Sequence, residues 1–393
     1  MKFIAILLHV YQPPTQLGFV VDEIARECYQ PLVNIFTCEL EPRFTLNINY
    51  SLTEHLVTRG HKEIIEGLRS ASEKGNLEFA DSGAYHPIFP LIPVSEVKRQ
   101  LELNQQGNRS VFGPSYSPKG IFPPEMCFSS HLARLFHEMG YSWCITDDLP
   151  YSYHNGTPPY NFIPKVSDVA VFLRSNTWSN DVSFHLWKGR DFLNTAKDRM
   201  SEWFGNNDGY LIIAMDGETF GHHHKYYEEK FFRSLLYAVR EDPEVKLVTL
   251  SELFKVFPTK EQFVPPSTWS ASMNDLCADD PYPLWRSKFN PIHHNQWVLT
   301  HHVMGMVNGT SGGDPEARKL LDKAIYSCQY WWASSWNYDP TQIFRGAYLL
   351  LDTLERAGRV SGDREAIRIG REMYNNLVFS ISERQRQQNE KKA

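Results

Sequence analysis

Residues 210–224 read Tyr-Leu-Ile-Ile-Ala-Met-Asp-Gly-Glu-Thr-Phe-Gly-His-His-His, so an apolar run passes directly into an acidic turn. A short apolar run that ends at turn residues is typical of a buried strand in a parallel sheet. Runs of the same kind recur upstream. We predict seven strands, at residues 3–8, 44–48, 77–81, 120–124, 141–146, 169–173 and 211–215.

Helical patterns lie between most of these strands, as at residues 52–74 and 94–108. Regular alternation of strand and helix indicates parallel strands with helical crossovers. Polar residues follow nearly every strand: His9, Asn47, Asn49, Asp81, Tyr85, His86, Glu125, Asp147, Asp148, Arg174, Asp216 and Glu218. In parallel β/α barrels the carboxyl ends of the strands carry the chemistry. The sequence therefore predicts an α/β barrel of seven strands with a polar site at one end.

The alternation stops near residue 258, where prolines at 258, 265, 266, 281 and 283 indicate a connector. Helical patterns follow at residues 295–307, 315–334, 341–357 and 364–382. We therefore expect a distorted (β/α)7 barrel over residues 1–265 and a C-terminal α-helical bundle over residues 266–383. Residues 384–393 are polar and are expected to form a frayed tail.

The composition excludes several classes of protein. The formal net charge is −6, which gives no electrostatic reason to expect nucleic acid or an anionic membrane as a partner. Six scattered cysteines form neither a disulfide framework nor a thiolate metal site. The apolar N-terminus is followed by Tyr11-Gln-Pro-Pro rather than by a small-residue cleavage site, so a buried first strand is expected. These observations favour a cytoplasmic protein, and they leave its oligomeric state open.

Two carboxylate segments are candidates for chemistry. Asp216 and Glu218 are two residues apart, so in an extended chain they point the same way and raise each other's pKa. A carboxyl group with a raised pKa can act as an acid near neutrality. The ordinary alternative is a helix-capping acid after a strand. Glu125 follows two prolines and an apolar strand, a rigid setting for a positioned carboxylate.

Four segments together resemble glycoside hydrolase family 57, the family of α-amylases, 4-α-glucanotransferases and branching enzymes. They are His9-Val-Tyr-Gln-Pro, the stretch from Glu78 to Tyr85-His86-Pro87, Pro124-Glu125, and Asp216-Gly-Glu-Thr-Phe-Gly221. Residues 168–174, with Ser179 and Phe184, also resemble a family segment, and Ala333-Ser-Ser-Trp336 is similar to a looser fifth motif. The resemblance covers roughly residues 1–340.

The resemblance implies a retaining reaction on α-linked sugars, with Glu125 as nucleophile and Asp216 as acid/base. It implies sugar contacts at His9, Glu78, His86 and Trp336. We also expect Gln12, Asp147, Arg174, Glu218 and His222 to belong to the substrate site. The expected partner is an α-glucan or another α-linked oligosaccharide, and we expect no cofactor and no metal.

Two departures from the family pattern concern the substrate. Tyr11 stands where the family usually has a second histidine, and Ser335 stands where many members have an acid. An α-galactosidase of the same family is a second candidate.

Alternatives outside the family stay open. A metal-dependent polysaccharide deacetylase could use the 15 histidines, which include adjacent ones at 222–224, 293–294 and 301–302. Adjacent histidines do not easily share one zinc ion, and a polar helix face is the ordinary explanation for the last two pairs. A non-catalytic carbohydrate-binding homologue is the remaining alternative, although a binding module has no need of an acid paired with a nucleophile.

Overall fold

The computed structural model describes residues 1–309 and 314–390, and the chain forms two compact units. The first, which we call the barrel unit, comprises Met1–Gln12, Gln16–Ala84 and Pro93–Trp269. The second, the helical unit, comprises Pro13–Thr15, Tyr85–Ile92 and the chain from Ser270 onward. The helical unit thus includes two short segments from the first hundred residues. The sequence predicts one boundary, after residue 265, and therefore assigns these segments to the barrel.

Seven strands of the barrel unit pair in parallel with their neighbours. They are β1 (Lys2–Val10), β2 (Phe44–Ile48), β3 (Leu77–Ala80), β4 (Gly120–Ile121), β5 (Trp143–Asp147), β7 (Val169–Arg174) and β8 (Gly209–Asp216). A strand lies at each of the seven predicted places, although β4 covers only the first two residues of the strand expected at 120–124. The distorted (β/α)7 barrel is confirmed.

The barrel is distorted because two pairs of neighbouring strands are joined by very few backbone hydrogen bonds. A single bridge between Asp81 and Ile121 joins β3 to β4. A single backbone hydrogen bond, from Ser175 N to Ile212 O at 2.8 Å, joins the end of β7 to β8. Three short strands were not predicted: β6 (Ile163–Val166), β9 (Val245–Val248) and β10 (Thr259–Glu261). β10 is exposed along its whole length and has no apolar run that would reveal it.

Alternate residues of each barrel strand face opposite sides. In β1, Ile4, Ile6 and Leu8 belong to the core beneath the helices, whereas Phe3, Ala5 and Leu7 belong to the core inside the barrel. The same alternation holds in β8, where Tyr210, Ile212 and Ala214 face inward. Because the period is two residues, the side chains that close these inward rows at the carboxyl ends also face the barrel interior.

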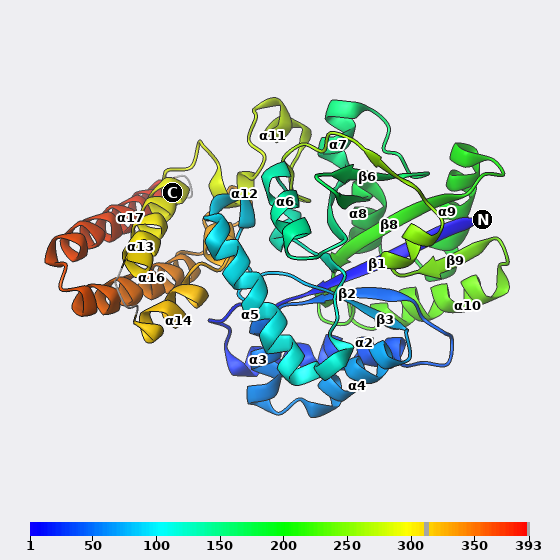
Figure 1. The fold of residues 1–393 in the computed structure, drawn as a ribbon, viewed down its shortest axis with the longest axis horizontal. Coiled ribbons are helices and arrows are strands. Elements are labelled where there is room, and N and C mark those ends of the chain that lie inside the picture. The colour runs from blue at the N-terminus through cyan, green and yellow to red at the C-terminus, as the bar shows by residue number, and fades with distance from the viewer. Residues whose placement is uncertain (310–313, 391–393) are drawn as a thin grey trace. The chain divides into compact units, whose positions relative to one another are not determined.

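Helices pack against the outer face of the barrel (Figure 1). The helices of this unit are α1 (Gly18–Ile24), α2 (Gln30–Phe36), α3 (Tyr50–Arg59), α4 (Lys62–Glu73), α5 (Val94–Phe112), α6 (Ser130–Glu138), α7 (Asp148–Asn155), α8 (Asn176–His185), α9 (Gly189–Phe204) and α10 (Ser234–Glu241). The single helix expected at 52–74 is two, α3 and α4, because Gly60 ends α3 in the left-handed conformation with φ 80°. Glycine adopts that conformation without a steric cost, so the chain turns there.

In the described part of the helical unit, every regular element is a helix, as predicted. The helices are α11 (Met273–Cys277), α12 (Pro283–Arg286), α13 (Pro291–Gly309), α14 (Pro315–Ala324), α15 (Cys328–Trp331), α16 (Pro340–Ser361) and α17 (Arg364–Glu390). α13, α14, α16 and α17 pack on one another as a bundle.

Two expectations for this unit need correction. The helix expected at 315–334 is two helices, because α14 ends at Ala324. The tail expected from residue 384 is the last part of α17, where Arg386 pairs with Glu383 and Glu390 along the helix. Positions 391–393 of that expectation lie outside the described residues. Among residues 1–309 and 314–390, no helix is both long and apolar enough to cross a bilayer.

Candidate active site

At the carboxyl ends of five barrel strands, the last inward-facing side chain is polar. His9 lies beside Asn47 on one flank and beside Asp216 on the other, as the register of β1 with β2 and with β8 shows. Asp147 and Arg174 are paired in the same way at the ends of β5 and β7. One end of the barrel therefore gathers these predicted site residues from strands that lie far apart in the sequence.

Glu125 follows β4 in an unusual backbone conformation. Glu125 has φ 59° and Met126 has φ 49°, a region that side-chain-bearing residues rarely adopt and that costs about 1–3 kcal/mol at each position. Their carbonyl groups are held from outside the turn, by Thr268 Oγ1 on Glu125 O at 2.7 Å and by Thr146 Oγ1 on Met126 O at 3.0 Å. Such strain persists only where the surroundings fix it, which is typical of a positioned functional group.

The Glu125 carboxylate accepts a hydrogen bond from Trp269 Nε1 at 2.9 Å. The Trp269 ring lies edge-on to His9 and to Phe122, with ring centroids 6.1 and 5.5 Å away. Trp269 therefore connects the predicted nucleophile to the end of β1.

Burial and the nearby charge of Asp216 raise the pKa of Glu125 to about 8, and the Trp269 hydrogen bond opposes them. Burial raises the pKa of Asp216 to about 6, and the positive charge of Arg174 opposes it. The Asp216 side chain is nevertheless open to solvent, so it is reachable from outside although protein atoms surround its base. The pKa values of the two carboxyl groups thus lie on either side of neutral pH, and the two groups interact electrostatically.

Glu218 is turned away from solvent into a small hydrogen-bond network. Its Oε1 accepts from the Tyr29 hydroxyl at 2.6 Å, from Gln12 Nε2 at 3.3 Å and from Tyr11 N at 3.3 Å. Burial, and then the charge of Asp216, raise its pKa to about 7. The expectation that Glu218 raises the pKa of Asp216 is reversed, because Asp216 has the lower pKa and is already charged when Glu218 loses its proton.

His9 is neutral and has a defined tautomer. Burial lowers its pKa to about 4, although the hydrogen bond to Asn47 favours the charged form. The Asn47 side-chain nitrogen donates to the carbonyl groups of Ala80 and Asp81, at 3.1 and 3.3 Å, so its oxygen faces the imidazole. The 2.7 Å bond from His9 Nδ1 to Asn47 Oδ1 is therefore a donated one.

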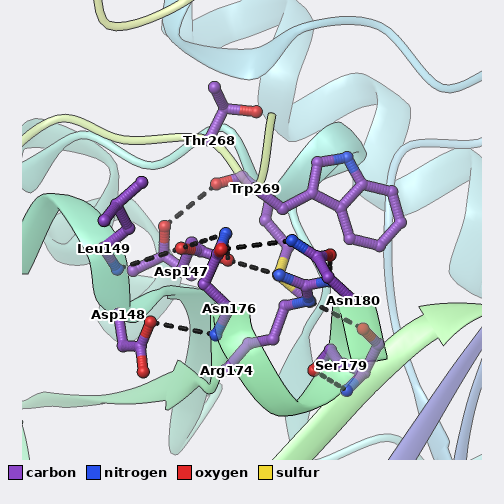
Figure 2. Close-up of polar contacts among 12 residues, drawn as sticks. Asp147, Asp148, Leu149, Arg174, Asn176, Ser179, Asn180, Thr268 and Trp269 are labelled. Atoms are coloured by element: carbon purple, nitrogen blue, oxygen red, sulfur yellow. Dashed lines mark hydrogen bonds and ion pairs between the residues drawn. The ribbon is translucent and has the colours of Figure 1, made fainter. Parts of the chain in front are cut away.

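Asp147 and Arg174 form a buried ion pair with 2.6 Å between Oδ2 and Nη1, as Figure 2 shows. Burial raises the pKa of Asp147, and the guanidinium of Arg174 lowers it. Neither side chain reaches solvent to any extent, with 0% and 4% exposed. Both residues had been expected to contact sugar, and the structure engages them with each other.

Two further expected sugar ligands lie apart from this group. Glu78 faces the barrel interior but lies one layer deeper, level with Thr45 and Leu7 rather than with His9. It accepts hydrogen bonds there from Ser251 and Thr45. His222 bonds through Nδ1 to Glu27 Oε2 at 2.8 Å in a partly exposed cluster. The structure therefore does not bring Glu78 or His222 together with Glu125 and Asp216.

The remaining two expected sugar ligands belong to the helical unit. His86 is buried, has φ 61° and bonds through Nδ1 to Ser327 Oγ at 2.8 Å. Trp336, in contrast, is 71% exposed. An aromatic side chain that is left so open does not contribute much to the core of this unit.

The sequence did not reveal Trp269 and Tyr29 as site residues. Trp269 stands in the proline-rich connector, where a lone tryptophan after Pro265-Pro266-Ser-Thr was a weak but available signal. Tyr29 lies inside a helical stretch and carries no local signal at all. In the chain as described, no group of three or more His, Cys, Asp or Glu side chains is arranged to hold a metal ion.

The chain is similar to known proteins in both sequence and structure. The model of glycosyl hydrolase family 57 matches residues 9–266. The α-amylase of Pyrococcus furiosus is 22% identical over 87% of this chain and 55% of its own length. The 4-α-glucanotransferase of Thermococcus litoralis is 22% identical over 87% of this chain and 54% of its own length.

A solved structure resembles nearly the whole chain. The branching enzyme of Pyrococcus horikoshii has a TM-score of 0.72 and 14% sequence identity, over 95% of this chain and 94% of that one. This likeness concerns the fold. The chain spans about half the length of the α-amylase and the glucanotransferase named above.

Proposed function

Because the chain belongs to glycosyl hydrolase family 57, we propose that its barrel unit catalyses retaining cleavage or transfer of α-linked sugars, with an α-glucan as substrate. The α-amylase and 4-α-glucanotransferase names of its relatives support the substrate class. The observation that carries the proposal is the electrostatically interacting pair of Glu125 and Asp216 at the carboxyl ends of the barrel strands.

In the proposed reaction, Glu125 attacks the anomeric carbon while Asp216 gives a proton to the departing glycosidic oxygen. The C–O bond of the substrate breaks and an ester bond to Glu125 forms. In the second step Asp216 takes a proton from water, or from a sugar hydroxyl, which then displaces Glu125. Two inversions leave the product in the α configuration. We propose that the two carboxyl groups are about 5–5.5 Å apart, as direct attack requires.

The proton of the free pair lies mainly on Glu125, because its pKa of about 8 is the higher of the two. The proposed roles need that proton on Asp216 when attack begins. Substrate binding favours this transfer, since the glycosidic oxygen accepts from a protonated Asp216 and the developing positive charge on the sugar favours an ionised Glu125.

Gln12 and His9 are proposed to orient the sugar from the end of β1, and His86 and Trp336 are proposed to add contacts from the helical unit. Glu218, which is bonded to Gln12, would hold that amide in place. We propose a cytoplasmic location, which the six free cysteines support, since thiols persist under reducing conditions.

A product profile tests the proposal. The protein is incubated with maltoheptaose, with amylose and with an aryl α-galactoside, and the first product is followed by proton NMR. Shortened or rearranged malto-oligosaccharides in the α form are expected. Turnover of the galactoside alone would give the α-galactosidase alternative, and a β product appearing first would refute retention.

A further inference from the structure

Arg174 links three barrel strands at the level of the site. From its place at the end of β7 it donates through Nε to the carbonyl of Ala214 in β8, at 2.7 Å. It donates through Nη1 to Asp147 in β5, at 2.6 Å, and through Nη2 to Asn180 in α8, at 2.8 Å (Figure 2). Three separate groups therefore fix the plane of the guanidinium.

Asp147 is itself held from several sides. Asn176 Nδ2 lies 3.1 and 3.2 Å from its two carboxylate oxygens, and Leu149 N donates to Oδ1 at 3.0 Å. A buried ion pair of good geometry whose remaining lone pairs are satisfied has little freedom to move. The Asp147–Arg174 ion pair is thus held rigidly at the site.

Both catalytic candidates, Glu125 and Asp216, are connected to this ion pair. Arg174 Cζ lies 5.7 Å from the centroid of the Trp269 ring, within the range of a cation–π contact. The same ring donates to Glu125 through Nε1. On the other side, Ala214 is two residues before Asp216 on β8, and the charge of Arg174 acts on Asp216 directly.

The charged groups around the two carboxyls are few. Asp216 faces Arg174 from β7 and Glu218 from its own turn, and Glu125 faces Asp216. Asp147 is paired with Arg174, and Asp148 accepts from Tyr160 and from Asn176 N. His9 is neutral at neutral pH. Arg174 is therefore the cation that acts on Asp216.

We propose that Arg174, fixed by Asp147, is a positioning residue that sets the charge of Asp216 and the orientation of Trp269 against Glu125, and that it is not a sugar ligand. This inference rests on the proposed function, whose two catalytic carboxyl groups it concerns. It also explains why Arg174 directs its hydrogen bonds into the protein.

The test uses the full chain with two variants and a control. Asp147→Asn/Arg174→Met removes both charges at once, so that no buried charge is left uncompensated. Arg174→Lys keeps the positive charge but loses the planar fork. Arg190→Met, which breaks an exposed ion pair with Glu241, is the matched control. Circular dichroism verifies that each variant is folded.

The main readout is the titration of Asp216, followed by NMR with ¹³C-labelled aspartate and assigned with Asp216→Asn. In the double variant Asp216 is expected to titrate about one pH unit higher, because the cation that lowers its pKa is gone. Arg174→Lys and Arg190→Met are expected to titrate like the parent protein. An unshifted Asp216 in the folded double variant overturns the proposal.

The second readout is steady-state kinetics on an aryl α-maltoside. Arg174→Lys is expected to lower kcat about tenfold with little change in KM, because the groups it orients are displaced rather than lost. A raised KM with unchanged kcat would make Arg174 a sugar ligand and contradict the proposal. The NMR titration needs no turnover, so a parent protein without glycosidase activity would refute the proposed function and leave the positioning role testable.

Discussion

At the scale of single residues, the backbone of Glu125 separates it from the other strand-end acids. Two consecutive residues with positive φ turn its side chain toward Trp269, and Thr268 and Thr146 hold that turn. The sequence indicated a rigid setting through Pro123 and Pro124. It gave no sign of the left-handed conformation, because glutamate has no preference for it.

The roles of the two carboxyl groups predict different responses to substitution. Glu125→Gln is expected to lower kcat about 10⁴-fold on any substrate, since the covalent bond is formed there. Asp216→Asn is expected to keep most of its first-step rate on an aryl glycoside with a good leaving group, because that group needs no proton. Added azide should then restore turnover of Asp216→Asn and yield the α-glycosyl azide. With Glu125→Gln, azide takes the place of the missing nucleophile, so the β-glycosyl azide is the expected product. An α-azide from Glu125→Gln would exchange the two assignments.

The pH dependence follows from the two pKa values. The active pair carries one proton, so kcat/KM should rise as the pH passes about 6, where a doubly protonated pair loses its first proton. It should fall as the pH passes about 8, where the second proton leaves. The profile on an aryl α-maltoside is expected to be bell-shaped with both limbs. A profile with a single limb would contradict a shared proton.

Trp269→Phe removes the N–H donor and keeps an aromatic ring. The Trp269 hydrogen bond stabilises the ionised form of Glu125, so its loss should raise the pKa of Glu125. The alkaline limb of the profile is expected to move up by about 0.5–1 pH unit. Trp203→Phe, at a half-exposed tryptophan of α9, is the control. An alkaline limb that stays in place would show that this bond is not made in solution.

At the scale of elements, the strands were predictable and the seams between them were not. Continuous apolar runs revealed all seven barrel strands, because buried parallel strands have no polar face to interrupt them. β4 is only two residues long, and its contact with β3 is a single bridge. No local pattern encodes such a joint, since it depends on where two chain segments meet.

The same limit applied to the site. The polar residues that follow the predicted strands placed His9, Asp147, Arg174 and Asp216 at one end of the barrel. Glu78 follows the same parity and lies a layer deeper, because register, which sequence does not display, decides depth. Trp269 was missed because it is supplied by the connector and not by a strand.

The turn after β8 gives a prediction at this scale. Gly221 has φ 101°, and a Cβ there would lie 1.9 Å from the carbonyl oxygen of Glu27, a backbone atom that cannot move aside. Gly221→Ala is expected to lower the free energy of unfolding by more than about 3 kcal/mol. Gly60→Ala is the matched control, since Gly60 has φ 80° and open space around it, and should cost only about 1 kcal/mol. Urea unfolding of both variants measures the difference, and equal losses would contradict the close approach.

At the scale of the whole molecule, composition and alternation predicted a barrel followed by a helical bundle. They placed all early residues in the barrel, whereas Pro13–Thr15 and Tyr85–Ile92 belong to the helical unit. Such assignments depend on tertiary contacts between segments far apart in sequence. His86 illustrates this, since its partner Ser327 is 241 residues away.

Trp336 tests whether the helical unit takes part in binding. Trp336→Ala is expected to raise KM for maltoheptaose about tenfold and to lower Tm by less than about 2 °C, because the side chain is 71% exposed. Phe379→Ala, at another exposed aromatic residue of this unit, should change neither. A large fall in Tm with an unchanged KM would make Trp336 a structural residue.

The three-piece composition of the helical unit also bears on how the chain folds as it leaves the ribosome. Every segment of the barrel unit has been synthesised by residue 269, so that unit can fold while translation continues. Pro13–Thr15 and Tyr85–Ile92 emerge early but must wait for partners that are made last. Until then Ile88 and Phe89, which are fully buried in the finished protein, stay without them. A nascent chain stalled after residue 269 should therefore expose the apolar Tyr85–Ile92 segment, to which chaperones can bind. A gene fragment that begins after residue 269 would lack Pro13–Thr15 and Tyr85–Ile92, so it would not encode the whole helical unit.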